Sequence, residues 1–173
     1  MVKEQFGFRE VLSTDTATYA FLNSVLMSLD KNRLDGGLFC DLQKAFDCVN
    51  RNILLAKLEF YGIRGTANQL MRSYFENRFQ RIIIKDNMHF KSTCTWIKME
   101  HGVPQGSLLG RLLFLIYIDE FAQILRDIAR PVLFADDTSI NISNSDKQEF
   151  KNNLEFVMDI AINLFQNNLF SIN

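Results

Sequence analysis

Apolar side chains recur at every third or fourth position in several stretches of the chain, which is the spacing of amphipathic helices. The clearest stripe consists of Phe150, Leu154, Val157, Ala161 and Leu164. Ser145 and Gln148 precede this stripe with the spacing of a capping box. We therefore expect a helix to begin there.

Four further helices are predicted from similar signals. We expect them over about residues 15–29, from a cap at Asn50 to a stop at Gly62, from a Thr66–Gln69 capping box to about residue 77, and from Leu108 to about Arg126. A Gly-Val-Pro-Gln-Gly segment at 102–106 breaks regular structure before the last of these.

Shorter apolar runs that are rich in branched and aromatic residues are typical of strands. We predict strands over 37–42, 81–85, 90–97, 132–135 and 138–142. Asp86-Asn87 and Asp136-Asp137 each separate two of these runs and suggest two hairpins. The order strand, helices, hairpin, helix, hairpin, helix favours an α+β domain over a doubly wound parallel sheet, with helices on one face of a small antiparallel sheet.

Composition indicates a single folded domain. The chain has 173 residues, of which 47% are hydrophobic and 23% are charged, values that disfavour disorder. The net charge of −1 does not favour tight nucleic-acid binding, because such binding depends on clustered Lys and Arg. Cys40, Cys48 and Cys94 are odd in number and lack zinc-site spacing, so we expect free thiols.

No signal peptide and no apolar run of transmembrane length are visible. The longest apolar stretch, residues 112–118, is followed directly by Asp119 and Glu120, so it is interpreted as a buried helix. We therefore expect an intracellular protein, nuclear or cytoplasmic, without a membrane partner.

Three aspartates stand out because apolar residues flank them. Asp41 ends the predicted strand at 37–42, and Asp136 and Asp137 form the tip of the second hairpin. Ionised carboxylates near a core are costly unless they are paired or bind a metal, and adjacent ones repel each other. A divalent cation would relieve the repulsion, and hard carboxylate oxygens favour Mg²⁺. Two such ions, roughly 3.5–4 Å apart, can clamp the oxygens of an in-line phosphoryl transfer.

The aspartates alone leave two interpretations open. Asp-Asp is a common turn pair, and Asp41 could cap a helix or pair with an arginine. Neighbouring strands of one sheet could instead bring Asp41 and Asp136 together, which shifts the balance toward a metal site. Residue types and spacing thus indicate at most a two-metal enzyme.

Longer segments around these aspartates resemble the palm motifs of LINE-type reverse transcriptases, the enzymes of non-LTR retrotransposons. The segments are Phe39-Cys40-Asp41-Leu42-Gln43-Lys44-Ala45-Phe46-Asp47, then His101 to Gly110 continued by Leu112 to Ile118, and then Phe134-Ala135-Asp136-Asp137-Thr138. Residues 5–9 look like a finger segment, and residues 168–173 look like the start of a fourth palm motif. Because the motifs follow the family's order nearly from end to end, the resemblance is specific.

The resemblance implies an RNA-directed DNA polymerase domain. Residues 1–35 would be partial fingers and residues 36–173 the palm, with motif segments at 37–47, 101–118, 132–142 and 168–173. The thumb, the rest of the fingers and any endonuclease domain would belong to other parts of a longer polyprotein. The partners would be an RNA template, a DNA primer and deoxynucleoside triphosphates.

The resemblance also assigns the catalytic centre. Asp41, Asp136 and Asp137 would be a catalytic triad that binds Mg²⁺, or Mn²⁺ in its place. The backbone carbonyl of Leu42 would add a ligand. Asp136 is expected to be the direct ligand of the adjacent pair, with Asp137 orienting the primer end.

A nucleotide-binding set follows from the same motifs. Phe46 would lie under the sugar, where its ring would exclude a ribose 2′-hydroxyl, and Gln105 and Gly106 would lie against the incoming nucleotide. From the residues alone, a core position is the favoured interpretation of Phe46, since the chain has 16 phenylalanines. Likewise, Gln105 and Gly106 could belong to an ordinary turn.

Two positions depart from the family's pattern. Arg111 stands where the family usually has proline, and Phe165 stands where it often has tryptophan. The alternative to an active polymerase is a truncated, catalytically inactive retrotransposon remnant. A metal-dependent nuclease is a third hypothesis, which the segments around Phe46 and Gln105 disfavour.

Overall fold

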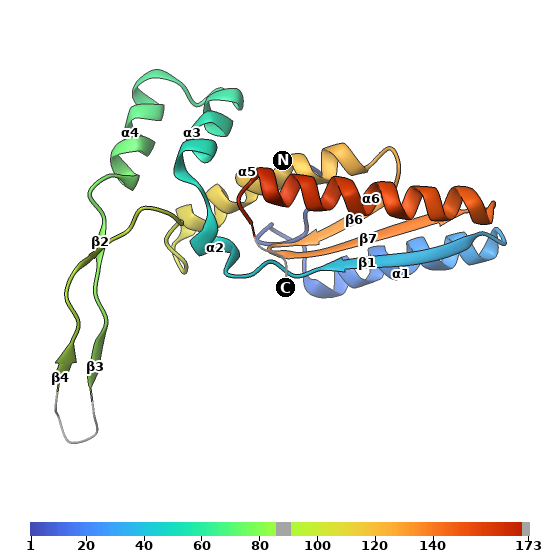
Figure 1. Cartoon of the computed structure of the whole chain (residues 1–173), viewed down its shortest axis with the longest axis horizontal. Coiled ribbons are helices and arrows are strands. Elements are labelled where there is room, and N and C mark those ends of the chain that lie inside the picture. The colour runs from blue at the N-terminus through green and yellow to red at the C-terminus, as the bar shows by residue number, and fades with distance from the viewer. Residues whose placement is uncertain (86–90, 171–173) are drawn as a thin grey trace.

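A computed structural model of the chain describes residues 1–85 and 91–170 (Figure 1). Its elements in chain order are α1 (Thr14–Asp30), β1 (Leu34–Cys40), α2 (Ala45–Cys48), α3 (Arg51–Phe60), α4 (Gly65–Phe75), β2 (Phe79–Gln80), β3 (Ile83–Lys85), β4 (Lys91–Thr93), β5 (Ile97–Lys98), α5 (Leu108–Leu125), β6 (Arg130–Phe134), β7 (Asp137–Asn144) and α6 (Lys147–Asn167). The predicted mixture of helices with antiparallel strands is confirmed.

The centre of the molecule is a three-stranded antiparallel sheet in the order β1-β7-β6. Cys40 pairs with Thr138 at the end of β1, and Phe134 pairs with Asp137 across the β6–β7 turn. Pro131 lies in β6, where the edge position of that strand tolerates a residue without an N–H donor. The N-terminal segment runs beside β6 through a parallel bridge between Gln5 and Leu133.

Helices cover both faces of this sheet, so the prediction of helices on one face only was wrong. Along β1, a Cβ at Gly36 would meet the Phe150 ring of α6, whereas one at Gly37 would meet the Phe21 ring of α1. Because side chains alternate along a strand, the two helices lie on opposite faces. Phe39 uses the α1 face and packs against Phe21 with ring centroids 5.4 Å apart.

The core lies between the sheet and helices α5 and α6. Ile140 and Ile142 of β7 are fully buried there, and the rings of Phe121 and Phe165 stack at 4.7 Å. Phe165 thus fills the core where the resembling family often has tryptophan. The five apolar positions predicted as a stripe on α6 are all buried or half-buried, which confirms that prediction.

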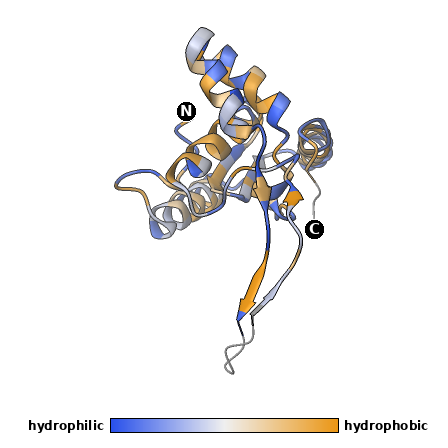
Figure 2. Ribbon diagram, turned by 90° about the vertical axis from the view of Figure 1, so that its left-hand side faces the viewer, coloured by the Kyte–Doolittle hydropathy of each residue, from blue (hydrophilic) through white to orange (hydrophobic). Residues whose placement is uncertain are grey.

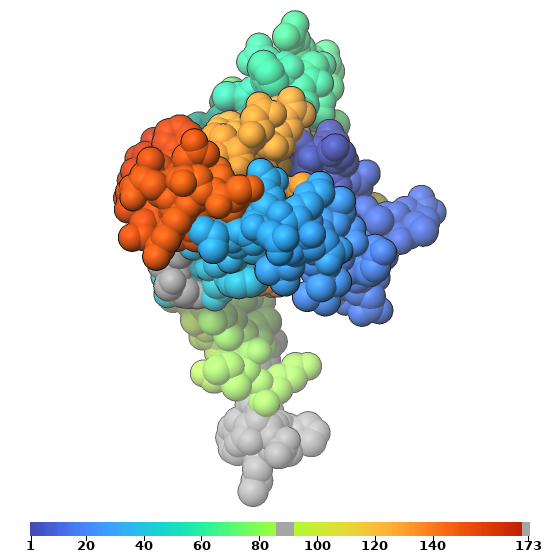
Figure 3. Space-filling view, turned by 90° about the vertical axis from the view of Figure 1, so that its right-hand side faces the viewer, coloured from blue at the N-terminus to red at the C-terminus, as the bar shows by residue number. Residues whose placement is uncertain are grey.

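Two features extend from one end of this body (Figure 1). Helices α3 and α4 form an antiparallel pair on one side, and the paired strands β2–β5 and β3–β4 form a two-stranded ribbon that leads away on the other. The ribbon projects beyond the body in the space-filling view (Figure 3). One of its strands is coloured as strongly hydrophobic in Figure 2.

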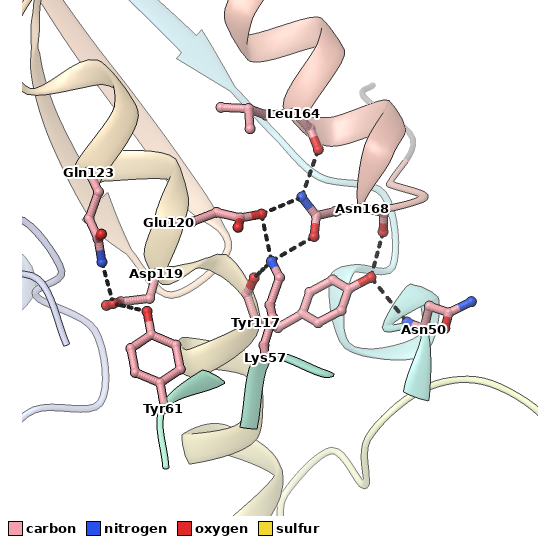
Figure 4. A network of polar contacts seen from close by, with 9 residues as sticks. All are labelled: Asn50, Lys57, Tyr61, Tyr117, Asp119, Glu120, Gln123, Leu164 and Asn168. Atoms are coloured by element: carbon pink, nitrogen blue, oxygen red, sulfur yellow. Dashed lines mark hydrogen bonds and ion pairs between the residues drawn. The ribbon is translucent and has the colours of Figure 1, made fainter. Parts of the chain in front are cut away.

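A polar network ties α3, α5 and the end of α6 together (Figure 4). Lys57 Nζ donates to the carbonyl oxygen of Tyr117, to Glu120 Oε1 and to Asn168 Oδ1, at 2.5, 2.7 and 2.7 Å. Tyr117 in turn donates its hydroxyl to the carbonyl of Asn168 and accepts from the backbone N–H of Asn50. Residues from three helices are thereby held in one arrangement.

Most predicted elements are present, with specific errors at their ends. Asn50 caps α3 as predicted, but α4 begins without a side-chain cap, so the Thr66–Gln69 capping box was wrong. The cap of α6 is Asp146 and not Ser145. The short helix α2 was not predicted, and the Asp86-Asn87 turn lies outside the described residues.

The ribbon is less regular than the predicted hairpin. Its strands are short pieces separated by residues outside the strand ladders, although the Cys94 N–H still donates to the Ile82 carbonyl across the ribbon. The sequence predicts continuous strands over 81–85 and 90–97 instead, and residue 90 lies outside the described residues. Within the described part of the chain, no helix combines the length and apolar character needed to cross a membrane.

Candidate active site

The three aspartates come from the same end of two adjacent strands. Asp41 directly follows Cys40, the last residue of β1, so the predicted strand at 37–42 begins three residues too late and ends two residues too late. Asp137 opens β7, next to Thr138, the partner of Cys40. Asp136 occupies the two-residue turn before it. The register therefore brings positions 41 and 136–137 to one corner of the sheet.

Electrostatics show that the three carboxyl groups interact. Partial burial, followed by the negative charges of Asp136 and Asp41, raises the pKa of the Asp137 carboxyl above its ordinary value. Like charges raise a carboxyl pKa in this way only when they are close enough to repel. The corner thus gathers the negative charges of three side chains, two of which act on the Asp137 carboxyl.

This corner suits a hard divalent cation in its chemistry, although it is not a complete protein cage. Among residues 1–85 and 91–170, no three His, Cys, Asp or Glu side chains already form a metal-holding group. Mg²⁺ normally takes only one or two carboxylates and keeps waters and substrate phosphates as its other ligands. The all-oxygen donors and the mutual repulsion of Asp41, Asp136 and Asp137 therefore fit such an ion.

A hydrogen bond from the β6–β7 turn to the N-terminal segment holds this turn in a strained conformation. Ala135 has a φ of +57°, in the left-handed region that costs a non-glycine residue on the order of 1–2 kcal/mol. Its backbone N–H donates to Gln5 Oε1 at 3.1 Å, and the same oxygen accepts from the Gly7 N–H at 2.7 Å. A Cβ on Gly7 would lie 2.2 Å from the Ala135 nitrogen, so only glycine allows this approach.

Gln5 is a site-positioning residue that sequence reasoning missed, because the segment at 5–9 was assigned to the fingers. Its side chain is 1% exposed. Replacing Gln5 by Leu would leave the N–H groups of Gly7 and Ala135 without their acceptor. We expect a loss of about 1–3 kcal/mol of unfolding free energy, measured by urea denaturation. A stability equal to that of the parent chain would contradict this role.

The loop between the ribbon and α5 is bonded to the segment that follows Asp41. The N–H of Gly102 donates to the carbonyl of Val49, and the N–H of Val103 donates to that of Phe46. Gly102 has a φ of +81°, and a Cβ there would lie 3.0 Å from the backbone of Asp47. The two segments that were predicted to bind a nucleotide are therefore in direct backbone contact.

The same loop is fixed to the start of α5. Ser107 caps the helix, with Oγ accepting from the N–H of Gly110 and donating to the carbonyl of Pro104. A Cβ on Gly110 would lie 2.2 Å from that carbonyl oxygen. Gln105 and Gly106 are exposed at the tip of the loop, with Gln105 lining a cavity of about 430 Å³.

Phe46 and Leu42 have buried side chains and do not form an exposed binding surface. Phe46 is 8% exposed, stacks on Phe114 at a centroid distance of 4.4 Å, and meets the edge of Phe8 at 6.2 Å. The side chain of Leu42 is buried in the same core. Phe46 thus has the packing of a core residue, while its backbone carbonyl accepts from the N–H of Val103 in the loop before α5.

Arg51 is a second positioning residue without a sequence signal. Its guanidinium donates to the carbonyls of Phe75, Met99, His101 and Gly102. Burial, followed by the charge of Arg78, lowers the pKa of Arg51. Four carbonyl acceptors on one guanidinium connect the end of α4 to the loop at 99–102, and such long-range acceptors cannot be read from local spacing.

Arg111 leaves the entry to α5 undisturbed. The helix begins at Leu108 behind its Ser107 cap, and the N–H of Arg111 bonds back to the Ser107 carbonyl. The guanidinium lies over the Phe8 ring, 5.1 Å from its centroid. Arg111 therefore connects the helix to the N-terminal segment.

The whole chain matches a known sequence family. The profile of the family described as "Reverse transcriptase (RNA-dependent DNA polymerase)" matches residues 1–171. The probable RNA-directed DNA polymerase from transposon BS of Drosophila melanogaster is 28% identical over 153 residues, which is 82% of this chain and 16% of that protein. The RNA-directed DNA polymerase from mobile element jockey of Drosophila funebris is 36% identical over 115 residues, 66% of this chain and 12% of that protein.

Solved structures of the same general fold come from telomerases. The telomerase of Candida albicans, in complex with a fragment of telomeric RNA, superposes with a TM-score of 0.62 at 13% identity over 97% of this chain and 30% of that one. The corresponding Candida tropicalis complex has a TM-score of 0.61 at 15% identity, over 99% of this chain and 29% of that one. The chain thus spans a minor part of each protein that it matches.

Proposed function

The chain belongs to the reverse transcriptase family, of the kind found in non-LTR retrotransposons, and from this premise we propose that it is the catalytic palm of an RNA-directed DNA polymerase. The proposed reaction adds a deoxynucleotide to a DNA primer on an RNA template. The observation that carries the proposal is the convergence of Asp41, Asp136 and Asp137 at one corner, where partial burial and then the charges of Asp136 and Asp41 raise the pKa of Asp137.

Each part of this corner has a separate task in the proposed reaction. Asp41 and Asp136 would hold the divalent cations, with the Leu42 carbonyl beside them, and Asp137 would orient the primer end. When bound, the cations supply acidification of the primer 3′-hydroxyl and neutralisation of the triphosphate charge. The strained Ala135 turn keeps the adjacent carboxylates in place before substrate arrives.

The nucleotide would be held on the other side by the loop at 101–107. Gln105 and Gly106 are exposed at its tip, and the loop is bonded to the backbone of Phe46. Fingers, a thumb and any endonuclease are proposed to come from the remainder of a longer polyprotein, since the chain covers 12–16% of the relatives named above.

Primer extension tests the proposal directly. The chain would be joined to the finger and thumb regions of the jockey polymerase and given a DNA primer, an RNA template, deoxynucleotides and Mg²⁺. We expect primer extension that stops when the ion is removed by chelation. No extension by this chimaera, under conditions where the intact jockey protein extends, would favour the inactive remnant. Nicking of duplex DNA without extension would favour a nuclease.

Sugar discrimination tests the role assigned to Phe46. Replacing Phe46 by Val should let the chimaera accept ribonucleotides more readily, because the smaller side chain leaves room for a 2′-hydroxyl. We expect the ratio of ribonucleotide to deoxynucleotide incorporation to rise at least about tenfold, the effect of roughly 1.4 kcal/mol. Phe114→Val, which thins the same ring stack from the other side, is the matched control. An equal ratio in both variants would make Phe46 a core residue only.

A further inference from the structure

The ribbon that projects from the body carries a charge unlike that of the rest of the chain. Its two arms, residues 78–85 and 91–98, contain five cationic residues and no acidic one. The five are Arg78, Arg81, Lys85, Lys91 and Lys98. The other 157 residues hold 14 cations against 20 acids, so a net charge of −1 conceals a basic arm on an acidic body.

The cations of the described arm residues are available to a partner. Arg81, Lys85 and Lys98 are exposed, and within the described residues neither ion pair of the chain involves the ribbon. Paired surface charges would already be neutralised, whereas these would gain from meeting a polyanion. Arg81 and Lys85 lie on one arm and Lys98 on the other, so both arms carry exposed positive charge.

An aromatic ring lies among these charges. Trp96 is 59% exposed, and the Arg81 guanidinium lies over it from the opposite strand, 4.5 Å from the ring centroid. Exposed rings flanked by arginines are the usual platform for unpaired bases. The neighbouring Ile82, Ile83 and Ile84 are also exposed, and they offer apolar contact beside the ring.

The base of the ribbon leads to the proposed nucleotide site. A cavity of about 430 Å³ is lined by Arg78 and Gln80 from the ribbon, by Asp47 after β1, and by Gln105 of the loop. The base of the ribbon and Gln105 therefore line the same cavity.

We propose that the two arms of the ribbon, residues 78–85 and 91–98, form a nucleic-acid-binding surface. In it the exposed Arg81, Lys85 and Lys98 hold the phosphates of single-stranded template RNA, and Trp96 stacks on an unpaired base. Only the naming of the bound strand as the template rests on the proposed function. An apolar strip alone would suit a protein partner equally well, but five cations without an acid match a phosphate backbone.

The sole tryptophan of the chain reports on this arm directly. The complete 173-residue chain would be titrated, without Mg²⁺ or nucleotides, with unlabelled single-stranded RNA of about 16 nucleotides, within the site sizes of such surfaces. We expect saturable quenching of Trp96 emission that weakens as salt is raised. Single-stranded DNA of the same sequence and the RNA–DNA hybrid form the comparison arms. Tighter binding of the hybrid than of free RNA would overturn the assignment to an unpaired strand.

Charge-matched variants separate the arm from the body. The triple variant Arg81→Gln, Lys85→Gln and Lys98→Gln should weaken RNA binding at least about tenfold and reduce the slope of log K against log salt by about 2–3, close to one for each lost phosphate contact. The control neutralises Lys31, Lys147 and Lys151, which are equally exposed on other elements. Equal binding by the two triple variants would overturn the proposal.

Other outcomes are also decisive. Trp96 emission that RNA leaves unchanged would mean that the ribbon does not bind RNA. Emission that shifts with protein concentration alone would mean that the ribbon contacts a second copy of the chain. Because the assay needs no catalysis, quenching by a chimaera that cannot extend primers would leave the arm standing while the polymerase proposal fails. Extension without quenching would reject the arm alone.

Discussion

Replacing Asp136 by Asn is expected to abolish primer extension by the jockey chimaera. The amide keeps the shape of the side chain but removes the charge that would hold a divalent cation. Metal ions in phosphoryl transfer contribute several kcal/mol, and each 1.36 kcal/mol is tenfold in rate. We therefore expect the extension rate to fall by at least about a thousandfold, measured under single-turnover conditions with saturating nucleotide.

The stability of the folded state should not fall with the activity. Asp136 repels Asp137 in the free protein, so its neutralisation should leave the melting temperature unchanged or slightly raised when no metal is present. Mg²⁺ should raise the melting temperature of the parent chain, because ligands stabilise the state that binds them, and it should not do so in the variant.

The matched control is Asp159→Asn on the exposed side of α6. It removes one carboxylate from the same chain at a distance from the corner, and it should retain both extension and the response to Mg²⁺. A parent chain with the same melting temperature at all Mg²⁺ concentrations would contradict a working metal site and favour the inactive remnant. Extension by the Asp136→Asn chimaera at the parent rate would exclude Asp136 from catalysis.

The part of the fold that sequence could predict is the part set by local patterns. The stripe at Phe150, Leu154 and Val157 fixes the buried face of α6, because its spacing is helical wherever the helix packs. Asn50 caps α3 for an equally local reason. Whether helices lie on one or both faces of the sheet depends on the partners of Gly36 and Gly37, which lie on distant helices.

The candidate site was predictable to a similar extent. Asp41, Asp136 and Asp137 carry their signal in apolar neighbours and in segments that resemble a family. Arg51 carries no such signal, and the resemblance placed Gln5 in a finger segment and not at the site. The roles of both residues depend on acceptors and donors that tertiary structure brings to them. Gln5 reaches Ala135 across 130 positions, and no spacing rule covers that distance.

The largest effect on stability is expected for Lys57, whose side chain lies between three helices and is only 14% exposed. Burial lowers the pKa of Lys57, and the hydrogen bond and charge of Glu120 partly offset this effect. Burial alone would raise the pKa of Glu120, but the hydrogen bonds from Lys57 and Asn168 outweigh it and lower that pKa. Each group therefore keeps its charge through the other.

Replacing Lys57 by Met keeps the apolar stem and removes only the ammonium. The Tyr117 carbonyl, Asn168 Oδ1 and Glu120 Oε1 each lose this donor, and the Glu120 charge loses its partner. Because Glu120 is 43% exposed, water recovers part of the loss, and we expect about 2–3 kcal/mol of destabilisation. For a chain of this size the melting temperature should fall by roughly 5–10 °C.

The dependence on pH distinguishes this network from simple loss of packing. A carboxyl whose pKa is lowered by folding stabilises the folded state at neutral pH, and that contribution disappears as pH falls below its ordinary pKa and through its lowered folded value. The difference in unfolding free energy between the parent chain and Lys57→Met should therefore be largest near neutral pH and shrink under acid. Lys151→Met, on the exposed face of α6, should show neither the destabilisation nor its dependence on pH. A difference that stays constant with pH would mean that Lys57 acts through its stem and not through the Glu120 pair.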